Sequence, residues 1–168
     1  MLALAVCGSW SEVPADAWVI ARPSVESSRR DREMLNLATT EGRRIMDWKI
    51  ELVAIPVSDA DRAKTFYVEK AGFNADHDHR VSDEVRFVQL TPPESACSIA
   101  IGTGISQSEP GSVQGMQMVV SDIQAAREEL LERGVEVSEI QEFDWGSFIF
   151  FSDPDGNGWA VQQIPARD

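Results

Sequence analysis

The spacing of apolar residues becomes regular only after residue 46. Residues 48–57, WKIELVAIPV, carry β-branched and aliphatic side chains at both parities and predict a strand covered on both faces. Residues 58–72 have a helical spacing, in which Ser58 or Asp59 can cap the first turn and Gly72 follows the last turn as a stop. Three short strands are then predicted at residues 73–81, 84–90 and 96–102.

The same order of elements is predicted again in the second half of the chain. Residues 113–122 predict a strand, and the helix that follows has a capping-box pattern at Ser121 and Gln124 and a stop at Gly134. The tripeptide Val-Ser-Asp recurs at an offset of 63 residues, and the two helical stops lie 62 residues apart. Three further strands are predicted at residues 135–143, 146–152 and 158–164. The repeated order predicts an internal duplication of a βαβββ module.

Residues 1–45 differ from the rest of the chain. They mix charged and small polar residues with little sustained period, and prolines interrupt their short apolar patch. We therefore expect a poorly ordered extension there. Met46 stands directly before the first strand-like run, so we also expect that translation of the native protein starts at Met46.

A turn rich in aspartate lies between the last two predicted strands, at residues 153–158, DPDGNG. Its D-x-D-x-N spacing resembles the beginning of a calcium loop. An EF-hand loop requires a glutamate at its twelfth position and helices on both sides, whereas Ile164 occupies that position and both flanks predict strands. The segment is therefore interpreted as a turn, in which Pro fixes φ and Gly or Asn accepts a positive φ.

These motifs together resemble a known family. The segments PVSDADRAKTFYVEKAGF, VVSDIQAAREELLERGVEV and FSDPDGNGW look like the vicinal oxygen chelate superfamily, which includes glyoxalase I, extradiol dioxygenases, fosfomycin-modifying enzymes and bleomycin-binding resistance proteins. The resemblance implies an α+β fold of two βαβββ modules, about 47–102 and 113–165, whose curved mixed sheets surround a cavity with the helices outside. We expect residues 46–168 to form a single glyoxalase-like domain.

The resemblance also implies where a metal would be held, on the inner faces of the first and last strands of each module. Those positions are occupied here by Leu52, Ala100, Gly115 and Ala160. A divalent ion needs several converging lone-pair donors, and none of these side chains has one. A register error of one residue would offer at best Glu51 with Gln114, or the thioether of Met116. The sequence therefore predicts no metal and no other cofactor.

The two histidines are a second candidate for metal binding. His77 and His79 are two residues apart in a predicted strand, so they point to the same side and could chelate an ion with Asp76 or Asp78. An exposed polar strand edge is the preferred interpretation, because acids and Arg80 flank the pair.

The expected cavity is assigned from strand parity. Gln117 and Gln162 share parity with Gly115 and Ala160, so both amides should face the cavity and could hydrogen-bond a ligand, with Gln89 as a weaker third. Aromatic residues would supply apolar contact. The complete set of expected cavity residues is Leu52, Gln89, Ala100, Gly115, Gln117, Trp145, Phe148, Ala160 and Gln162.

Charge and cysteine usage limit the partners. Residues 1–45 hold six Arg against six acids, so the net charge of −13 falls on residues 46–168. An acidic body argues against nucleic acid or a membrane as partner and is compatible with a cationic ligand. Cys7 and Cys97 have no metal-type spacing and are interpreted as reduced thiols of a cytoplasmic protein.

Two classes of function fit this pattern. The preferred hypothesis is a metal-free protein, similar to the drug-sequestering resistance proteins, that binds a small molecule between its modules and is not an enzyme. The alternative is a metal-dependent lyase, isomerase or dioxygenase of the same superfamily with displaced ligands, or a metal-free catalyst that uses Glu51 or Asp144. The resemblance further implies a homodimer.

Overall fold

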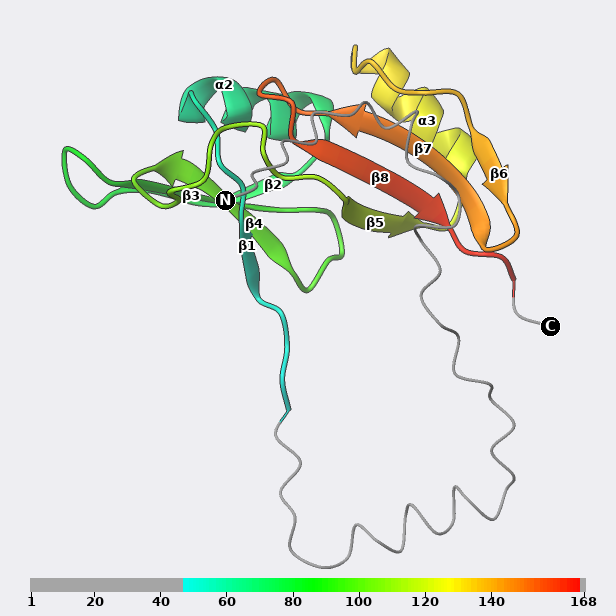
Figure 1. Cartoon of the computed structure of the whole chain (residues 1–168), viewed down its shortest axis with the longest axis horizontal. Coiled ribbons are helices and arrows are strands. Elements are labelled where there is room, and N and C mark those ends of the chain that lie inside the picture. Colours follow the sequence, from blue (N-terminus) through cyan, green and yellow to red (C-terminus); the bar gives the residue numbers. More distant parts are fainter. Residues whose placement is uncertain (1–46, 167–168) are drawn as a thin grey trace, which may run out of the picture. The chain divides into compact units, whose positions relative to one another are not determined.

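The computed structural model describes residues 47–166 of the chain. The expectations about residues 1–45 and about a start at Met46 lie outside this range. Within it, the chain forms two modules that share one order of elements, a strand, a helix and three further strands (Figure 1). The α+β fold with two βαβββ modules, predicted from the sequence, is confirmed.

Each module contributes one four-stranded sheet. The first contains β1 (Leu52–Ala54), α2 (Ala60–Thr65), η3 (Phe66–Lys70), β2 (Asn74–Arg80), β3 (Arg86–Thr91) and β4 (Ser98–Thr103). The second contains β5 (Met116–Val120), α3 (Ile123–Glu132), β6 (Gln141–Phe143), β7 (Gly146–Ser152) and β8 (Gly158–Gln163). Among the described residues no helix has the length and apolar character that crossing a membrane requires.

The two sheets have the same topology. Their strand orders are β1-β4-β3-β2 and β5-β8-β7-β6. The first strand of each module pairs in parallel with the last strand, and the other pairs are antiparallel. Within residues 47–166 no strand of one sheet pairs with a strand of the other. Both helices lie on the upper side of the sheets in Figure 1, so each sheet has one helix-covered face and one face directed away from the helices.

The core lies between each sheet and its helix and is continuous across the modules. In the first module Ile55, Val88 and Ile101 are fully buried, and Ala63 and Tyr67 cover them from the helix side. The second module adds its own apolar residues to the same cluster, namely Ile123, Leu130, Val135, Ile149, Phe151, Trp159 and Val161. Burial of this apolar surface is the main contribution to the stability of the fold.

The helix starts follow from local side-chain chemistry, with one correction. Asp59 caps α2 by accepting hydrogen bonds from the backbone N–H groups of Arg62 (3.0 Å) and Asp61 (2.9 Å), which hold the pKa of Asp59 below its usual range. The capping box expected at Ser121 is wrong, because Asp122 is the N-cap of α3 and accepts from the Ala125 N–H at 3.0 Å. Both helices are therefore capped by the carboxylate of an N-cap aspartate whose own backbone is extended.

The helix stops are confirmed, and they reveal a difference in length. Gly72 and Gly134 have φ values of +77° and +73°, a conformation that glycine adopts without strain. The first helix continues from α2 into the wider π turn of η3, where the Ala71 N–H donates to the Phe66 carbonyl at 3.0 Å. A π turn accommodates one extra residue in a helix, which explains why the repeat offset falls from 63 to 62 between the helix start and its stop.

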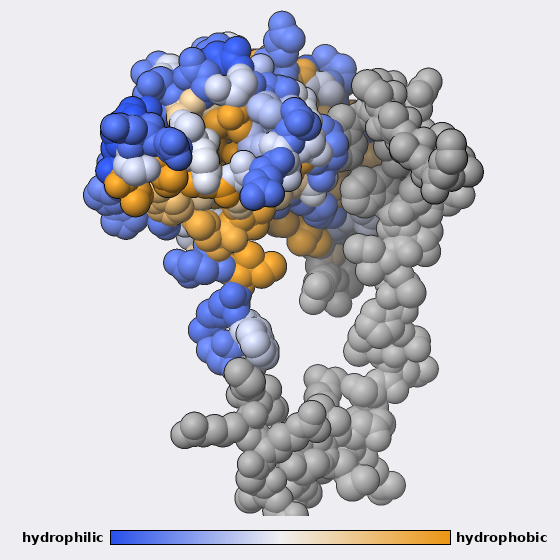
Figure 2. All heavy atoms as spheres, turned by 60° about the vertical axis from the view of Figure 1, so that its left-hand side comes forward, coloured by the Kyte–Doolittle hydropathy of each residue, from blue (hydrophilic) through white to orange (hydrophobic). Residues whose placement is uncertain are grey.

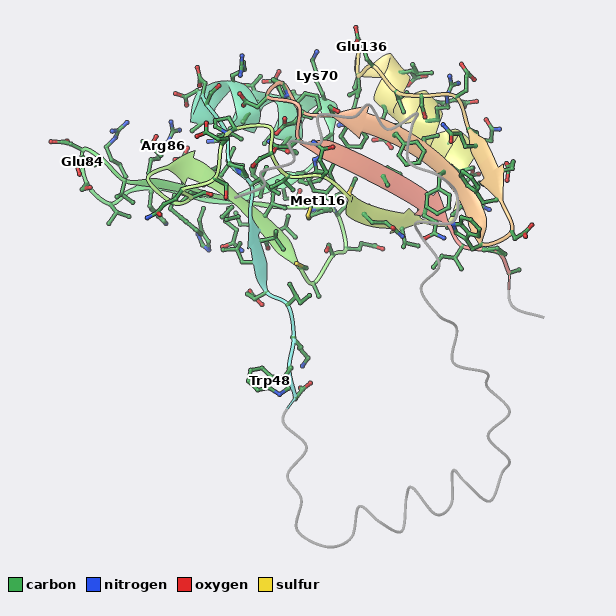
Figure 3. All side chains as sticks on the ribbon, viewed as in Figure 1. Trp48, Lys70, Glu84, Arg86, Met116 and Glu136 are labelled. Atoms are coloured by element: carbon green, nitrogen blue, oxygen red, sulfur yellow. The ribbon has the colours of Figure 1, made fainter. Side chains whose placement is uncertain are left out.

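The first predicted strand is too long and requires correction. The expected strand at residues 48–57 is reduced to β1, Leu52–Ala54, which pairs with Ser98–Ala100 of β4. Trp48 and Ile50 are 82% and 73% exposed, and Figure 3 shows Trp48 far from both sheets. An apolar run indicates strand propensity, but a strand also needs a neighbouring strand to pair with. Only three residues of this run pair with β4.

Candidate functional site

The expected cavity residues lie on the sheet faces directed away from the helices. On the first sheet, Ala100 pairs with both Ala54 and Gln89, and Leu52 shares their face because it is two residues from Ala54. Ala100 is 1% exposed, whereas Leu52 is 38% exposed. The structure thus brings Leu52, Gln89 and Ala100 to one face of the first sheet.

The remaining expected residues belong to the second module. Gln117 pairs with Ala160, and Gln162 pairs with Phe148, so these four side chains share one face. Gly115 lies just before β5, in a left-handed conformation with φ +80°. The expected set is therefore divided between two sheets that share no strand pairing within the described residues.

A chain of amide hydrogen bonds crosses this face of the second sheet. The Gln117 Nε2 donates to Gln162 Oε1 at 2.6 Å, and Gln162 Nε2 donates to the Trp145 carbonyl at 2.8 Å. Gly146 permits this contact, because a Cβ there would lie 3.0 Å from Gln162 Nε2 and 2.4 Å from the Gln163 carbonyl oxygen. The two predicted glutamines therefore act as one polar unit beside Trp145.

Four aromatic rings flank the two glutamines and are called here the aromatic platform: Phe143, Trp145, Phe148 and Phe150. Phe143 and Trp145 stack with ring centroids 5.1 Å apart and an interplanar angle of 11°. Phe148 meets Phe143 edge to face at 5.6 Å and stacks on Phe150 at 6.2 Å. The sequence predicted Trp145 and Phe148 for this surface but not Phe143 and Phe150, although the alternation within β7 gives Phe150 the same parity as Phe148.

The corresponding face of the first sheet carries a strip of polar side chains beside Leu52 and Ala100. Gln89 Nε2 donates to Ser98 Oγ at 3.1 Å, Ser98 and Thr91 share a hydroxyl hydrogen bond of 2.7 Å, and the Thr91 hydroxyl donates to Asp76. This polar strip, formed by Asp76, Gln89, Thr91 and Ser98, was missed apart from Gln89. The strand pairing that brings Ser98 opposite Leu52 and near Gln89 is not visible in local sequence.

The two histidines lie on the same side of β2, as their spacing predicts. Their rings stack with centroids 5.6 Å apart. Asp78 is not available to them, because hydrogen bonds from Arg86 and Lys64 engage its carboxylate and hold its pKa well below the usual range. In the part of the chain that the structure describes, no group of three or more His, Cys, Asp or Glu could hold a metal ion.

The aspartate-rich segment is a turn between β7 and β8, as predicted. The buried Asp153 carboxylate accepts from the backbone N–H groups of Asp155 and Asn157, from Asn157 Nδ2 at 2.7 Å and from the Tyr67 hydroxyl at 2.9 Å. Both oxygens of the Asp153 carboxylate therefore accept hydrogen bonds from protein donors. Burial, and then the nearby Asp153 charge, raise the pKa of Tyr67 far above its usual value.

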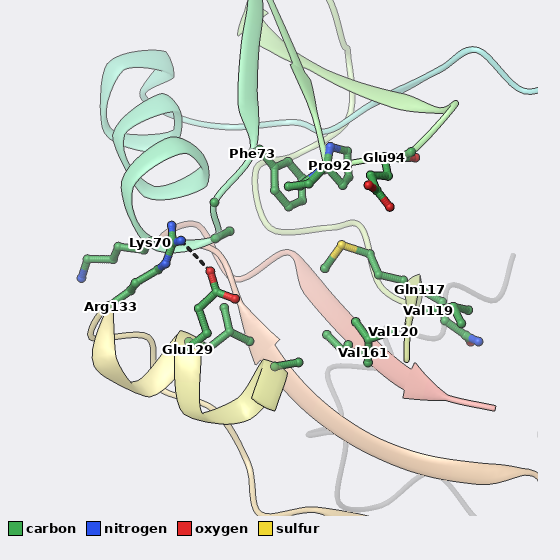
Figure 4. A pocket seen from close by; sticks show the side chains of 17 residues that line it. Lys70, Phe73, Pro92, Glu94, Gln117, Val119, Val120, Glu129, Arg133 and Val161 are labelled. Carbon is green, nitrogen blue, oxygen red and sulfur yellow. Dashed lines mark hydrogen bonds and ion pairs between the residues drawn. The ribbon is translucent and has the colours of Figure 1, made fainter. Parts of the chain in front are cut away.

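A pocket of about 660 Å³ lies between the two modules on the helix side of the second sheet (Figure 4). It is bounded by the end of the first helix, the β3–β4 turn, β5 and α3. Of the nine expected cavity residues, Gln117 alone lies along it, and the Gln117 amide is engaged by Gln162. This pocket is therefore distinct from the site expected on the sheet faces.

Comparison with known proteins identifies the family. The model of the Glyoxalase/Bleomycin resistance protein/Dioxygenase superfamily matches residues 49–161. The chain belongs to this superfamily. The uncharacterized protein YetH of Bacillus subtilis (strain 168) is 30% identical over 119 residues, which are 68% of this chain and 98% of YetH.

Solved structures similar to this chain include one antibiotic binding protein. TnmS3, an antibiotic binding protein from Streptomyces sp. CB03234, is 33% identical with a TM-score of 0.67, over 73% of this chain and all of TnmS3. A glyoxalase/bleomycin resistance protein from the same organism is 35% identical with a TM-score of 0.62, over 68% of this chain and all of that one. A superfamily member from Sphaerobacter thermophilus DSM 20745 is 31% identical with a TM-score of 0.63, over 71% of this chain and 99% of that one.

Exposed apolar side chains of this superfamily member gather on the faces that carry the expected site. Leu52 on the first sheet and Val119 and Trp145 on the second are 38%, 58% and 37% exposed. Val119 pairs with Gln162 and so shares the face of the aromatic platform. Figure 2 shows apolar residues along the lower side of the described body. Large exposed apolar patches commonly mark binding surfaces.

Proposed function

We propose that the protein binds a small molecule on the sheet faces directed away from the helices, without a metal. The observation that carries this proposal is the aromatic platform beside the Gln117–Gln162 amide pair. Stacked rings offer a flat apolar surface, and the amide pair retains donor and acceptor capacity for a polar group of the guest. The likeness to TnmS3, an antibiotic binding protein, supports a drug-like guest.

The donor set supports binding without a metal. Leu52, Ala100, Gly115 and Ala160 occupy the positions where metal-dependent members of the superfamily hold their ligands, and they offer no side-chain lone pair. The amides of Gln117 and Gln162 are engaged with each other and with the Trp145 carbonyl. Sequestration of a guest therefore suits these residues better than a metal-dependent lyase, isomerase or dioxygenase reaction.

Electrostatics supports a cationic guest. The net charge is −13, and Asp144 lies between the platform residues Phe143 and Trp145. Aromatic faces attract cations through their quadrupole, by about 0.5–2 kcal/mol for each well-placed contact. We therefore propose a planar guest that carries a positive charge.

A second copy of the chain would complete the cavity. The platform on the second sheet and the polar strip on the first sheet lie on the faces directed away from the helices, and β1 and β5 are edge strands. A two-fold dimer would bury Leu52 and Val119. A guest would then lie between an aromatic platform and a polar strip. The equal topology of the two modules supports their origin by internal duplication.

Binding is tested with pairs of planar aromatic compounds that share a skeleton and differ in one cationic group. The cationic member is expected to raise the melting temperature of the wild type more than its neutral counterpart does. Phe148→Ala should weaken binding by about tenfold, a loss of about 1.4 kcal/mol, whereas Leu131→Ala on the exposed side of α3 should leave it unchanged. Equal binding by both variants would contradict the assignment of the site.

Metal content and oligomeric state give two further tests. Protein purified without chelator should contain no stoichiometric Ni, Zn, Fe or Mn; a bound metal whose removal abolishes a reaction would favour the enzyme alternative. Sedimentation should give a dimer for the wild type and a monomer for Val119→Asp, because a charge at this position would be buried in the interface. A monomeric wild type would refute the shared cavity.

A further inference from the structure

The internal repeat gives the molecule two junctions between its modules. Counted from the helix N-caps, Tyr67 is the eighth residue after Asp59, and Leu130 is the eighth residue after Asp122. Likewise, Pro92 directly follows β3, and Asp153 directly follows β7. Tyr67 meets the β7–β8 turn of the other module, and Leu130 faces the β3–β4 turn. We call these the tyrosine junction and the leucine junction.

The tyrosine junction is filled. Tyr67 is fully buried, donates to Asp153 and accepts a hydrogen bond from Trp159 Nε1 at 3.2 Å. Its ring packs edge to face against Trp159, with centroids 5.9 Å apart. Asn157 closes the junction by donating to the Pro56 carbonyl at 2.9 Å. No space for a guest remains at these contacts.

The leucine junction is hollow, and its space is the pocket of about 660 Å³ in Figure 4. Leu130 is shorter than Tyr67 and carries no polar group that could reach the β3–β4 turn. The apolar walls come from both modules: Phe73, Pro92, Met118, Val120, Leu130 and Val161. A volume of this size falls in the range that holds a drug-sized molecule.

The charged residues around the pocket are already engaged or lie at its rim. Arg133 pairs with Glu129 at 2.5 Å, and Lys70 donates to the Gly134 carbonyl at 3.3 Å, at the C-terminal end of the neighbouring helix. Glu94 lies at the opposite rim. Two basic and two acidic residues leave no excess charge, so the pocket favours an uncharged guest over either ion.

The backbone at the rim is strained. Glu94 has φ +61°, a left-handed conformation that a residue with a Cβ rarely adopts. Such strain persists only where the surrounding structure imposes it, and it is concentrated at ligand-binding sites and switches. The β3–β4 turn, which borders the leucine junction, is therefore held in an unfavourable conformation beside an open apolar space.

We propose that the leucine junction is a second binding site, which takes an uncharged apolar small molecule. The guest would contact Leu130 and Met118 of the second module and Phe73 and Pro92 of the first, and would take the place that Tyr67 fills at the other junction. This site is separate from the aromatic platform, because no platform residue lines it; the edge strand β5 borders it with Met118 and Val120 on the helix side and with Gln117 and Val119 from the other face.

The test uses N-phenyl-1-naphthylamine, an uncharged apolar fluorophore, with the full chain. The wild type should bind it saturably, and Leu130→Phe should weaken binding by about tenfold because the added ring occupies the pocket. Leu131→Phe makes the same change at the adjacent position, 44% exposed, and should bind like the wild type. Phe148→Ala, which affects the aromatic platform, should also bind like the wild type.

A second measurement does not depend on any variant. In protein labelled with ¹³C at the methionine methyl groups, the fluorophore should shift the Met118 signal and give intermolecular contacts to it. Absence of saturable binding, an unshifted Met118 signal at saturation, or equal affinity of folded Leu130→Phe and Leu131→Phe would each overturn the proposal. Loss of binding in Phe148→Ala alone would assign the fluorophore to the sheet faces and overturn it as well.

Discussion

The tyrosine and leucine junctions occupy corresponding places in two modules of equal topology, yet only one of them is closed by specific contacts. At the tyrosine junction a phenol, a buried carboxylate, an indole and an amide satisfy one another across the module boundary. At the leucine junction the corresponding side chains are Leu130 and Pro92, neither of which can form such bonds. Two modules of equal topology can therefore supply both an attachment between them and an open space.

The largest effect is expected from removing the carboxylate of the tyrosine junction. Asp153→Ala leaves the Tyr67 hydroxyl and the backbone N–H of Asn157 buried without their acceptor, at about 1–3 kcal/mol for each group. We expect the free energy of unfolding in urea to fall by about 4 kcal/mol. Pro92→Ala, at the corresponding place of the leucine junction, should lower the free energy of unfolding by less than about 1 kcal/mol, as a surface substitution does. Similar losses for both variants would remove the contrast between the junctions.

The single tyrosine of the chain makes the pH dependence of the tyrosine junction measurable. Burial raises the pKa of Tyr67 in the folded state, so the unfolded chain loses this proton first as pH rises. Stability from this group is complete below the unfolded pKa of about 10 and should then fall by about 1.4 kcal/mol for each pH unit. Tyrosinate absorbance at 295 nm should therefore rise together with unfolding. A native-state titration near pH ~10 would contradict a closed junction.

Removing a polar group from the tyrosine junction and adding apolar volume to the leucine junction should change the free energy of unfolding in opposite directions. Tyr67→Phe keeps the ring but removes the hydroxyl that bonds Asp153 and Trp159, and should lower the free energy of unfolding by about 1.5 kcal/mol. Leu130→Phe adds apolar volume to a pocket and should raise it by about 0.5–1 kcal/mol. Urea unfolding of both variants measures this difference. Destabilisation by Leu130→Phe would indicate that the space cannot accept a ring.

The smallest effect is expected at the rim of the tyrosine junction. Arg62 Nη2 lies 2.7 Å from Asp155 Oδ1, while the corresponding position on α3, counted from the N-cap, is Ala125. Because the Arg62 side chain is 49% exposed, screening limits the pair, and Arg62→Ala should cost about 0.5 kcal/mol or less. The loss should shrink further in high salt. A loss as large as that of Tyr67→Phe would show that the rim matters as much as the buried contacts.

Local patterns predicted much of the fold. The helix stops at Gly72 and Gly134 and most strands follow from glycine conformation and from alternation, which are properties of short segments. The length of β1 does not, because strand pairing with β4 limits it. The capping residue of α3 was misassigned since Ser121 and Asp122 are both good caps, and only the backbone geometry distinguishes them.

Only part of the candidate site could be predicted from the sequence. Parity along a strand places Gln117 with Ala160 and Gln162, and the structure brings the two amides into contact. Contacts between distant segments have no local signal: 86 residues separate Tyr67 from Asp153. The pocket at the leucine junction was missed for the same reason, although comparing Tyr67 with Leu130 across the repeat would have pointed to it.

The extra residue in the first helix also bears on how the two halves can diverge. A helix advances by about 100° for each residue, so a deletion at Phe66, the first residue of η3, would turn the later side chains, Tyr67 among them, away from their present partners. The first helix carries Tyr67, whose bonds to the other module depend on that orientation. Leu130 of α3 forms no comparable hydrogen bond to the first module. Conservative substitutions at Leu130 should therefore be tolerated more readily than changes between Phe66 and Lys70, so that new ligand preferences would arise first at the leucine junction.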